Sequence, residues 1–225
     1  HAGRRVALSE VMIEDAAGRL IAHGSSLCFV FPPEPASPTP PPELQTVREP
    51  EYPTPDPYLR PVIGQVRSQE IWDKMSGLEV MIAGLTGELP APPMRYLTGL
   101  WLVEAAHGQS VSVLPATKWL CPPTGKVQGG VIAMLADAAL SGAIMTVTPA
   151  ATAMASVDLK VNFLRPGIAD DRELLARGTV AHSGRTIAVA HSEVVDADGK
   201  RVALATGSAL LLPGRAASLV DLPVD

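Results

Sequence analysis

Residues 125–147 read GKVQGGVIAMLADAALSGAIMTV, and this stretch decides the fold. Two glycines, Gly129 and Gly130, precede an apolar run that contains a single carboxylate, Asp137. The run after Gly130 is 17 residues long, which is just short of a membrane span, and its carboxylate would be costly in lipid. We therefore predict a helix over about 130–147 that is buried inside the protein, and we expect no membrane partner.

The segments around this helix predict an α+β domain. A helical stretch is expected before it, and runs of β-branched and aliphatic residues between turn residues predict strands on both sides. The expected elements are a helical stretch over 68–85 and strands over 99–106, 109–115, 153–164 and 173–182, with a hairpin over 185–212. A single buried helix followed by antiparallel strands favours a sheet that wraps around the helix.

The first 32 residues resemble the end of the chain. An ungapped comparison of residues 1–32 with residues 182–213 gives nine identical positions, which indicates an internal repeat. Each copy predicts a β-hairpin, with a turn at Asp15–Gly18 in the first copy and at Asp196–Gly199 in the second. Two strands alone are at best marginally stable, so the first hairpin should complete a larger sheet. We expect that sheet to come from a missing first copy of the domain or from a second chain.

Proline divides the chain into segments. Of the 22 prolines, 12 lie between Pro32 and Pro61, where they prevent regular helix or sheet hydrogen bonding and are typical of a semi-rigid linker. The predicted segments are the last hairpin of a truncated first domain at 1–32, a proline-rich linker at 33–67, a complete domain at 68–215 and a tail at 216–225. The chain begins with His1 and not with methionine, so we interpret it as part of a longer protein.

Composition and charge argue against several classes of function. The formal net charge is −5 and the basic residues form no dense block, which disfavours a nucleic-acid partner. The two cysteines, Cys28 and Cys121, lack the spacing of a disulfide framework or a zinc site. The five histidines are scattered without an HxxxH or HExxH spacing, so no metal site is expected. A reduced, cytoplasmic location fits this cysteine usage best.

Asp137 and the glycine pair are the candidate catalytic groups. No basic side chain stands three or four residues from Asp137, so its charge either pairs with a distant arginine or is used in a reaction. The N–H groups of Gly129 and Gly130 are expected at the positive end of the helix dipole, where they suit a polarised carbonyl. About 11 Å of helix separates them from Asp137, so a symmetric interface is the easiest place for one site to use both. Ser141 is expected to be a packing residue.

Several ordered motifs are similar to those of the PaaI-like acyl-CoA thioesterases, a family with the hotdog fold. The motifs are SGLEVMIAGLTGELPAPPMRYLTG, GKVQGGVIAMLADAAL, ASVDLKVNFLRP and HSGRTIAVAHSEVVDADGKRVALATGSALLLP, and they span residues 76–213. The hairpin at 1–32 resembles the last of them. The resemblance implies an α+β hotdog protein with a tandem repeat, in which an antiparallel sheet wraps around one long central helix, and it implies a homo-oligomer.

The resemblance also implies an activity and a site. The activity is hydrolysis of acyl-CoA thioesters between two hotdog units, without a metal or redox cofactor and with coenzyme A as part of the substrate. Gly129 and Gly130 match the glycines whose N–H groups polarise the thioester carbonyl, and Asp137 matches the carboxylate that activates water or attacks directly. Ser156 matches a polar residue that helps to hold the water. Candidates to bind the coenzyme A phosphates are Lys160, Arg165 and Arg185.

Two departures from the family pattern leave alternatives open. Gln128 stands where most relatives have histidine, and Pro122 and Pro123 replace an asparagine in the preceding loop. Glutamine can hydrogen-bond a carbonyl or orient water, but it cannot titrate. The chain is therefore either an acyl-CoA thioesterase or a catalytically attenuated half that binds acyl-CoA or has a structural role. A dehydratase of 3-hydroxyacyl thioesters is a third interpretation, which the missing histidine disfavours.

Overall fold

The computed structural model describes residues 6–29 and 61–218, and the chain divides into two compact units, His1–Pro53 and Thr54–Asp225. The first unit contains a β-hairpin and the second is an α+β domain. Most of the linker predicted at 33–67, and the last seven residues of the tail, lie outside the described residues. The predicted segment boundaries stay predictions.

The first unit contains the hairpin that the repeat predicts. Strand β1 (Val6–Glu14) pairs antiparallel with β2 (Leu20–Phe29). In the turn between them, the Asp15 carboxylate accepts hydrogen bonds from two main-chain N–H groups. Gly18 has a φ of 77°, which is the left-handed region that favours glycine.

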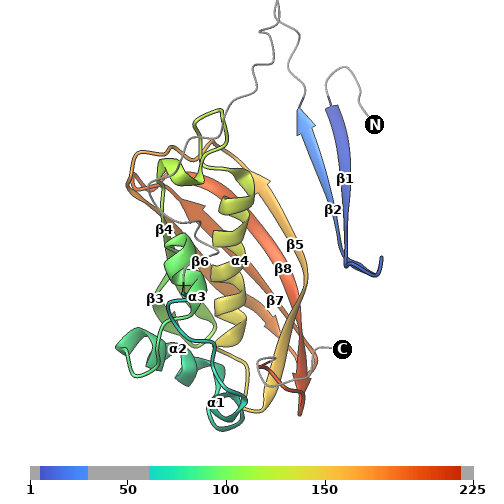
Figure 1. Cartoon of the computed structure of the whole chain (residues 1–225), viewed down its shortest axis with the longest axis vertical. Helices are drawn as coiled ribbons and strands as arrows, with labels where there is room; N and C mark the ends of the chain where they lie inside the picture. Colours follow the sequence, from blue (N-terminus) through green and yellow to red (C-terminus); the bar gives the residue numbers. More distant parts are fainter. Residues whose placement is uncertain (1–5, 30–60, 219–225) are drawn as a thin grey trace, which may run out of the picture. The chain divides into compact units, whose positions relative to one another are not determined.

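The second unit is a sheet of six antiparallel strands with one long helix across its face (Figure 1). Its helices are α1 (Gln69–Lys74), α2 (Gly77–Thr86), α3 (Pro93–Thr98) and α4 (Gly129–Met145), with a 3-10 turn, η2, at Lys118–Leu120. Its strands are β3 (Trp101–Ala106), β4 (Gln109–Pro115), β5 (Thr152–Phe163), β6 (Glu173–Ser183), β7 (Ile187–Val195) and β8 (Arg201–Pro213). The strand order is β3-β4-β6-β7-β8-β5, so β3 and β5 are the edge strands. The long helix and the strands confirm the elements expected from the sequence.

The helical stretch predicted at 68–85 is two helices and not one. Ser76 begins α2 with a capping box, in which its hydroxyl accepts a hydrogen bond from the Glu79 N–H and the Glu79 carboxylate accepts one from the Ser76 N–H. An N-cap residue takes an extended backbone, so Ser76 separates α1 from α2. The structure also has a helix that was not predicted, α3, which begins with Pro93. Proline is favoured at the first helical position, so it can start a helix as well as end one.

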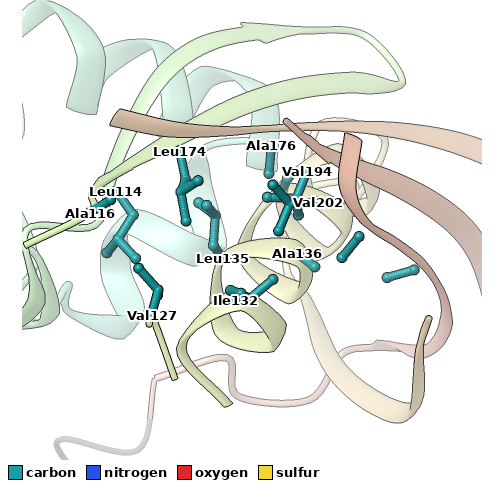
Figure 2. Packing of buried hydrophobic residues seen from close by; sticks show 13 residues of the cluster. Leu114, Ala116, Val127, Ile132, Leu135, Ala136, Leu174, Ala176, Val194 and Val202 are labelled. Atoms are coloured by element: carbon teal, nitrogen blue, oxygen red, sulfur yellow. The ribbon is translucent and has the colours of Figure 1, made fainter. Parts of the chain in front are cut away.

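The hydrophobic core lies between α4 and the sheet. The buried residues of α4 recur every three or four positions and so form one face of the helix; they are Ile132, Leu135, Ala136, Ala139, Leu140, Ala143 and Ile144. Figure 2 shows Leu135 of α4 close to side chains of the sheet such as Leu174 and Val194. Burial of this face sets the rotation of α4, and Asp137 lies outside the buried face.

Small residues line the sheet beneath α4. Ser110, Gly178 and Ser192 stand in one row across β4, β6 and β7. The Ser110 hydroxyl donates to the main-chain carbonyl of Ala139 at 2.6 Å, and the Ser192 hydroxyl donates to that of Ala136 at 2.9 Å. A Cβ at Gly178 would overlap the Ala139 carbonyl, so the helix approaches the sheet most closely there. The sheet therefore holds α4 by its main chain.

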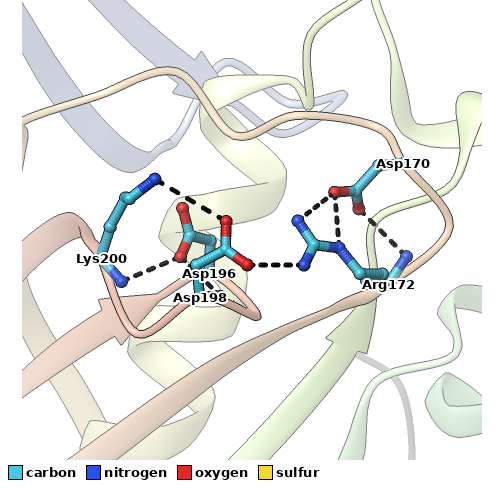
Figure 3. A network of polar contacts seen from close by, with 5 residues as sticks. All are labelled: Asp170, Arg172, Asp196, Asp198 and Lys200. Carbon is cyan, nitrogen blue, oxygen red and sulfur yellow. Dashed lines mark hydrogen bonds and ion pairs between the residues drawn. The ribbon is translucent and has the colours of Figure 1, made fainter.

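A network of ion pairs joins the loop before β6 to the β7–β8 turn (Figure 3). Arg172 lies 2.8 Å from Asp170 and 2.7 Å from Asp198, and Lys200 lies 3.7 Å from Asp198. The Arg172 guanidinium lowers the pKa of both carboxyls. Because these groups are exposed, the network contributes little to stability and chiefly orients the loop.

The two hairpin turns make the same hydrogen bonds. In the β7–β8 turn, the Asp196 carboxylate accepts hydrogen bonds from the N–H groups of Asp198 and Lys200. In the β1–β2 turn, the Asp15 carboxylate accepts from the equivalent residues, Ala17 and Arg19. Gly199 has a φ of 75°, close to that of the first-unit glycine. The hairpins predicted at both ends of the chain are confirmed, and the tandem repeat of whole domains stays a prediction.

Candidate active site

The N-terminus of α4 is capped by Gln128. Its side-chain Oε1 accepts a hydrogen bond from the Val131 N–H at 3.1 Å, and its main-chain carbonyl accepts from the N–H groups of Val131 and Ile132. The Gln128 N–H donates to the Leu120 carbonyl at 2.9 Å, which fixes the preceding loop. Since Oε1 serves the helix, the Nε2 group of Gln128 is the part of this side chain that remains for a substrate carbonyl or a water.

Two N–H groups at the start of α4 are open. The first turn of a helix has four N–H groups without an intrahelical acceptor; here that of Gln128 donates to the Leu120 carbonyl and that of Val131 donates to Oε1 of Gln128. Within the described part of the chain, no acceptor is found for the N–H groups of Gly129 and Gly130. They stand at the positive end of a helix of 17 residues. The pair can therefore donate to the oxygen of a polarised carbonyl.

The two glycines differ in their surroundings. A Cβ at Gly129 would meet only the Phe163 ring, at an ordinary contact distance of 3.5 Å. A Cβ at Gly130 would lie 2.7 Å from Oε1 of Gln128 and would displace the cap. A side chain at 130 would therefore disturb the Gln128 cap, whereas one at 129 would make only an ordinary contact with Phe163.

Asp137 is a half-buried carboxylate in the middle of α4. Ser141 Oγ donates to its Oδ1 at 3.2 Å, and no cation of residues 6–29 and 61–218 forms an ion pair with it. Burial raises the pKa of the Asp137 carboxyl above its ordinary value, and the Ser141 hydrogen bond lowers it in part. A carboxylate with a raised pKa is a stronger proton acceptor, as a general base requires.

Replacing Ser141 by alanine is expected to raise the pKa of Asp137 further, because the hydrogen bond favours the ionised carboxyl. A reaction that uses Asp137 as its base becomes faster with rising pH as this carboxyl loses its proton. The midpoint of that rise should therefore move to higher pH in Ser141→Ala. The measurement is the pH dependence of kcat/KM, with Ser183→Ala at the exposed end of β6 as control. An unchanged midpoint would show that Ser141 is only a packing residue, as the sequence suggested.

Ser156 lies on the helix side of β5. It pairs with Ala209, a core residue of β8, and follows Met154, which lines a hollow together with Ser141. Asp137 precedes Ser141 by one helical turn, which is a rise of about 6 Å toward the start of α4. Ser156 follows Met154 by two strand residues, which is also about 6 Å in the same direction. The structure thus brings Ser156 to the level of Asp137, although no hydrogen bond joins the two in the described part of the chain.

The three cations predicted to bind coenzyme A lie far apart. Arg165 lines a hollow of about 430 Å³ together with Gln128 and Lys126. Lys126 was not predicted as a site residue, although it stands only two residues before Gln128 in the sequence. Lys160 is exposed on β5. Arg185 is in the β6–β7 turn beside the first residues of β5, whereas Arg165 follows the last. Since β5 has 12 residues, roughly 40 Å separates its ends, and one chain does not bring Arg185 to the start of α4.

Among the described residues, no three His, Cys, Asp or Glu side chains are grouped closely enough to hold a metal ion. Within the same residues, no helix is both long and apolar enough to cross a membrane. Cys28 and Cys121 are both free thiols. The expectation of chemistry without a metal or redox cofactor stays a prediction.

Sequence comparison finds relatives over the segment that carries the site. The family model described as Thioesterase superfamily matches residues 124–203, which include the start of α4, Asp137 and Ser156. A protein of Halobacterium salinarum that is named as a candidate esterase is 37% identical over 121 residues, which cover 49% of this chain and 78% of that protein.

Solved structures share the fold of the second unit. A phenylacetic acid degradation-related protein of Ralstonia eutropha, described as a candidate thioesterase, is 27% identical with a TM-score of 0.53, covering 57% of this chain and 97% of its own. A thioesterase family protein of Silicibacter pomeroyi is 26% identical with a TM-score of 0.50, covering 54% of this chain and 90% of its own. These neighbours confirm the predicted α+β fold, in which a long antiparallel sheet packs around a central helix.

Proposed function

Because the chain belongs to the thioesterase superfamily and has its hotdog fold, we propose that it hydrolyses the thioesters of coenzyme A. The family and the esterase-named relative support thioester hydrolysis in general, and the coenzyme A half of the substrate is the proposed part. The observation that carries the proposal is the half-buried Asp137 on the helix whose first turn leaves the N–H groups of Gly129 and Gly130 open. Thioester hydrolysis needs both a base for water and donors for the developing oxyanion.

In the proposed reaction, Asp137 takes a proton from water as the water oxygen bonds to the thioester carbonyl carbon. The N–H groups of Gly129 and Gly130 stabilise the negative charge that develops on the carbonyl oxygen. The C–S bond then breaks and the proton passes from Asp137 to the coenzyme A sulfur, which leaves a carboxylic acid and a thiol. Direct attack by Asp137, followed by hydrolysis of the resulting anhydride, is a second form of this mechanism. Ser156 is proposed to hold the water.

We infer that this reaction takes place at a seam between two hotdog units. Along α4, about 12 Å separates Gly129 from Asp137, which is too far for one carbonyl group to touch both. A second unit facing the first would bring the helix start of one unit to the carboxylate of the other. The partner is a second chain in a homo-oligomer, or a first hotdog copy that ends in the β1–β2 hairpin. Exposed apolar side chains of this hairpin, such as Met12, Ile21 and Leu27, suit strands of a larger sheet.

Coenzyme A is proposed to bind over the start of α4. Lys126 and Arg165 line the hollow beside Gln128, so two cations adjoin the open N–H groups and suit phosphate oxygens. Lys160 is exposed on the neighbouring strand β5, and the proposed role of Arg185 requires the partner unit. A cytoplasmic location is proposed because two cysteines without the spacing of a disulfide framework suit a reducing compartment.

The second candidate function is binding of acyl-CoA without turnover. The observation that favours it is the Gln128 side chain, which caps α4 and cannot exchange a proton. Saturable binding of an acyl-CoA without release of free thiol would support this function against hydrolysis.

The proposed function is tested by measuring thiol release from aliphatic and aromatic acyl-CoA thioesters with the whole chain. Gly129→Ala is an informative variant because a Cβ at this position meets only ordinary contacts. We expect a melting temperature equal to that of the wild type and turnover lower by roughly 10- to 100-fold, less than the loss of a whole oxyanion donor. Unchanged turnover in Gly129→Ala would show that a Cβ at this position does not touch the bound thioester, which contradicts a substrate carbonyl placed against the Gly129 N–H, and wild-type inactivity toward every thioester would contradict the proposed function.

A further inference from the structure

Arg67 is a half-buried cation with no hydrogen-bond partner among residues 6–29 and 61–218. It immediately precedes Ser68, the N-cap of α1, and its Nε is buried with no acceptor among the described residues. Burial lowers the pKa of the Arg67 guanidinium from its ordinary value. A buried charge without a counterion costs free energy, so such a group points to an anion that binds there.

The acidic side chains of α1 and α2 do not meet this charge. Glu70, Asp73 and Glu79 each bond to a side chain or main-chain group close by in sequence. The guanidinium carbon of Arg67 lies 5.9 Å from the centroid of the Trp72 ring, a distance at which the attraction between cation and ring is weak. The anion that would neutralise Arg67 is therefore sought outside these helices.

Arg67 lines two hollows that reach α4 next to Asp137, one at Ala138 and one at Ser141. The first, of about 220 Å³, is lined by Arg67, Met81 and Ala138, the residue after Asp137. The second, of about 190 Å³, is lined by Arg67, Met81 and Ser141, which donates to Asp137. Most other lining residues are apolar. Since a cavity of about 150 Å³ holds a benzene molecule, each hollow is large enough for a short acyl chain or a ring.

Gly84 leaves space for the Arg67 guanidinium. A Cβ at Gly84 would lie 3.0 Å from Nη2 of Arg67, which is tighter than ordinary packing. Gly84 stands inside α2, where glycine is less favourable than alanine. Helix α2 thus has a glycine, which disfavours helix formation, at the point where it contacts the Arg67 guanidinium.

We propose that Arg67 determines the substrate class, and that the hollows it lines, which reach α4 at Ala138 and Ser141, accept an acyl group that ends in a second carboxylate. The inference rests on the proposed thioesterase function and names its substrate. The apolar lining would contact the methylene groups of the acyl chain, and the guanidinium would bind the far carboxylate by charge-assisted hydrogen bonds. Binding of such an acyl group gives Arg67 the counterion that α1 and α2 do not supply.

The test compares acyl-CoA thioesters of equal length with and without a terminal carboxylate: succinyl with butyryl, adipyl with hexanoyl, and suberyl with octanoyl. For the best-fitting length we expect kcat/KM to favour the dicarboxylic thioester by roughly 10- to 100-fold, as hydrogen bonds to charged groups allow. In Arg67→Met the ratio should fall to about one, and Arg67→Lys should keep part of it. Arg177→Met, at an exposed arginine of β6, is the matched control and should keep the full ratio.

Two results would overturn the inference while leaving the thioesterase function intact. One is a wild-type ratio near one for every pair, and the other is a ratio that Arg67→Met does not change. Melting temperatures add a readout that does not need hydrolysis, because adipate should stabilise the wild type more than hexanoate does, and should lose this advantage in Arg67→Met. If that advantage is seen and no thioester is hydrolysed, the proposed function fails and the anion site at Arg67 stands.

The stability of Arg67→Met is a further check. Removing an unpaired buried charge should leave the melting temperature of the free protein unchanged or higher. A melting temperature that is lower at neutral pH but equal to that of the wild type in acid would show that a carboxylate of the chain itself already pairs with Arg67, and would overturn the proposal.

Discussion

Asp137→Asn is expected to lower kcat for acyl-CoA hydrolysis by about 10²–10⁴, the range that general base catalysis contributes. Asparagine has nearly the same shape and can still accept the hydroxyl of Ser141, but it can neither take a proton from water nor attack a thioester. Steady-state kinetics of thiol release measure the effect. Asp73→Asn, at an exposed carboxylate of α1, is the control and should keep wild-type turnover.

The same substitution separates catalysis from folding. Because burial raises the pKa of Asp137, the folded chain binds this proton more readily than the unfolded chain does. The ionised carboxylate therefore destabilises the fold as pH rises through the interval between the ordinary and the raised pKa. We expect Asp137→Asn to melt at a higher temperature than the wild type at neutral pH, and this difference to vanish in acid. Wild-type turnover in Asp137→Asn would refute the catalytic assignment, and a lower melting temperature at neutral pH would contradict a charge without a partner.

Gly178→Ala is expected to produce the largest loss of stability of any substitution considered in this chain. The added Cβ would overlap the main-chain carbonyl of Ala139, and a helix backbone cannot move aside as the end of a flexible side chain can. We expect the free energy of unfolding to fall by about 3 kcal/mol or more. For a domain of this size, such a loss corresponds to a decrease of roughly 6–12 °C in the melting temperature.

Denaturant titration and thermal melting of the whole chain measure this effect. Arg177→Ala is the matched control, because Arg177 is the preceding residue of β6 and its exposed side chain is on the opposite face of the sheet. It should change the free energy of unfolding by less than about 0.5 kcal/mol. Equal stability of the two variants would mean that α4 does not approach the sheet at Gly178 as closely as the structure shows.

The long helix and the strands were predictable because their signals are local. An apolar run with one carboxylate predicted α4, and the Asp-to-Gly turns predicted both hairpins. The division between α1 and α2 was also present in the sequence, since Ser76 and Glu79 have the spacing of a capping box. The pattern over 68–85 nevertheless predicts a continuous helical stretch, because apolar and helix-forming residues continue on both sides of Ser76.

The candidate site was predictable only in part. Asp137 and the two glycines could be found because they share one helix and their spacing follows from helix geometry. Arg67 gives no signal in the sequence, since its place beside Gly84 depends on how the segment before α1 packs against α2, and no local pattern encodes that contact. The sequence does not predict the cap at Gln128, because glutamine is not among the usual N-cap residues.

The bonds from Ser110 and Ser192 to the carbonyls of Ala139 and Ala136 bear on how this domain diversifies in evolution. These bonds from the sheet go to main-chain carbonyls of α4, which are present whatever the side chains are. They do not depend on the side chains of the outer face of the helix. Substitutions at outward positions such as Ala138 can therefore accumulate without shifting the carboxylate beside them. Under the proposed function, descendants of one ancestral gene could change the acyl group that they prefer while keeping Asp137 in the same place.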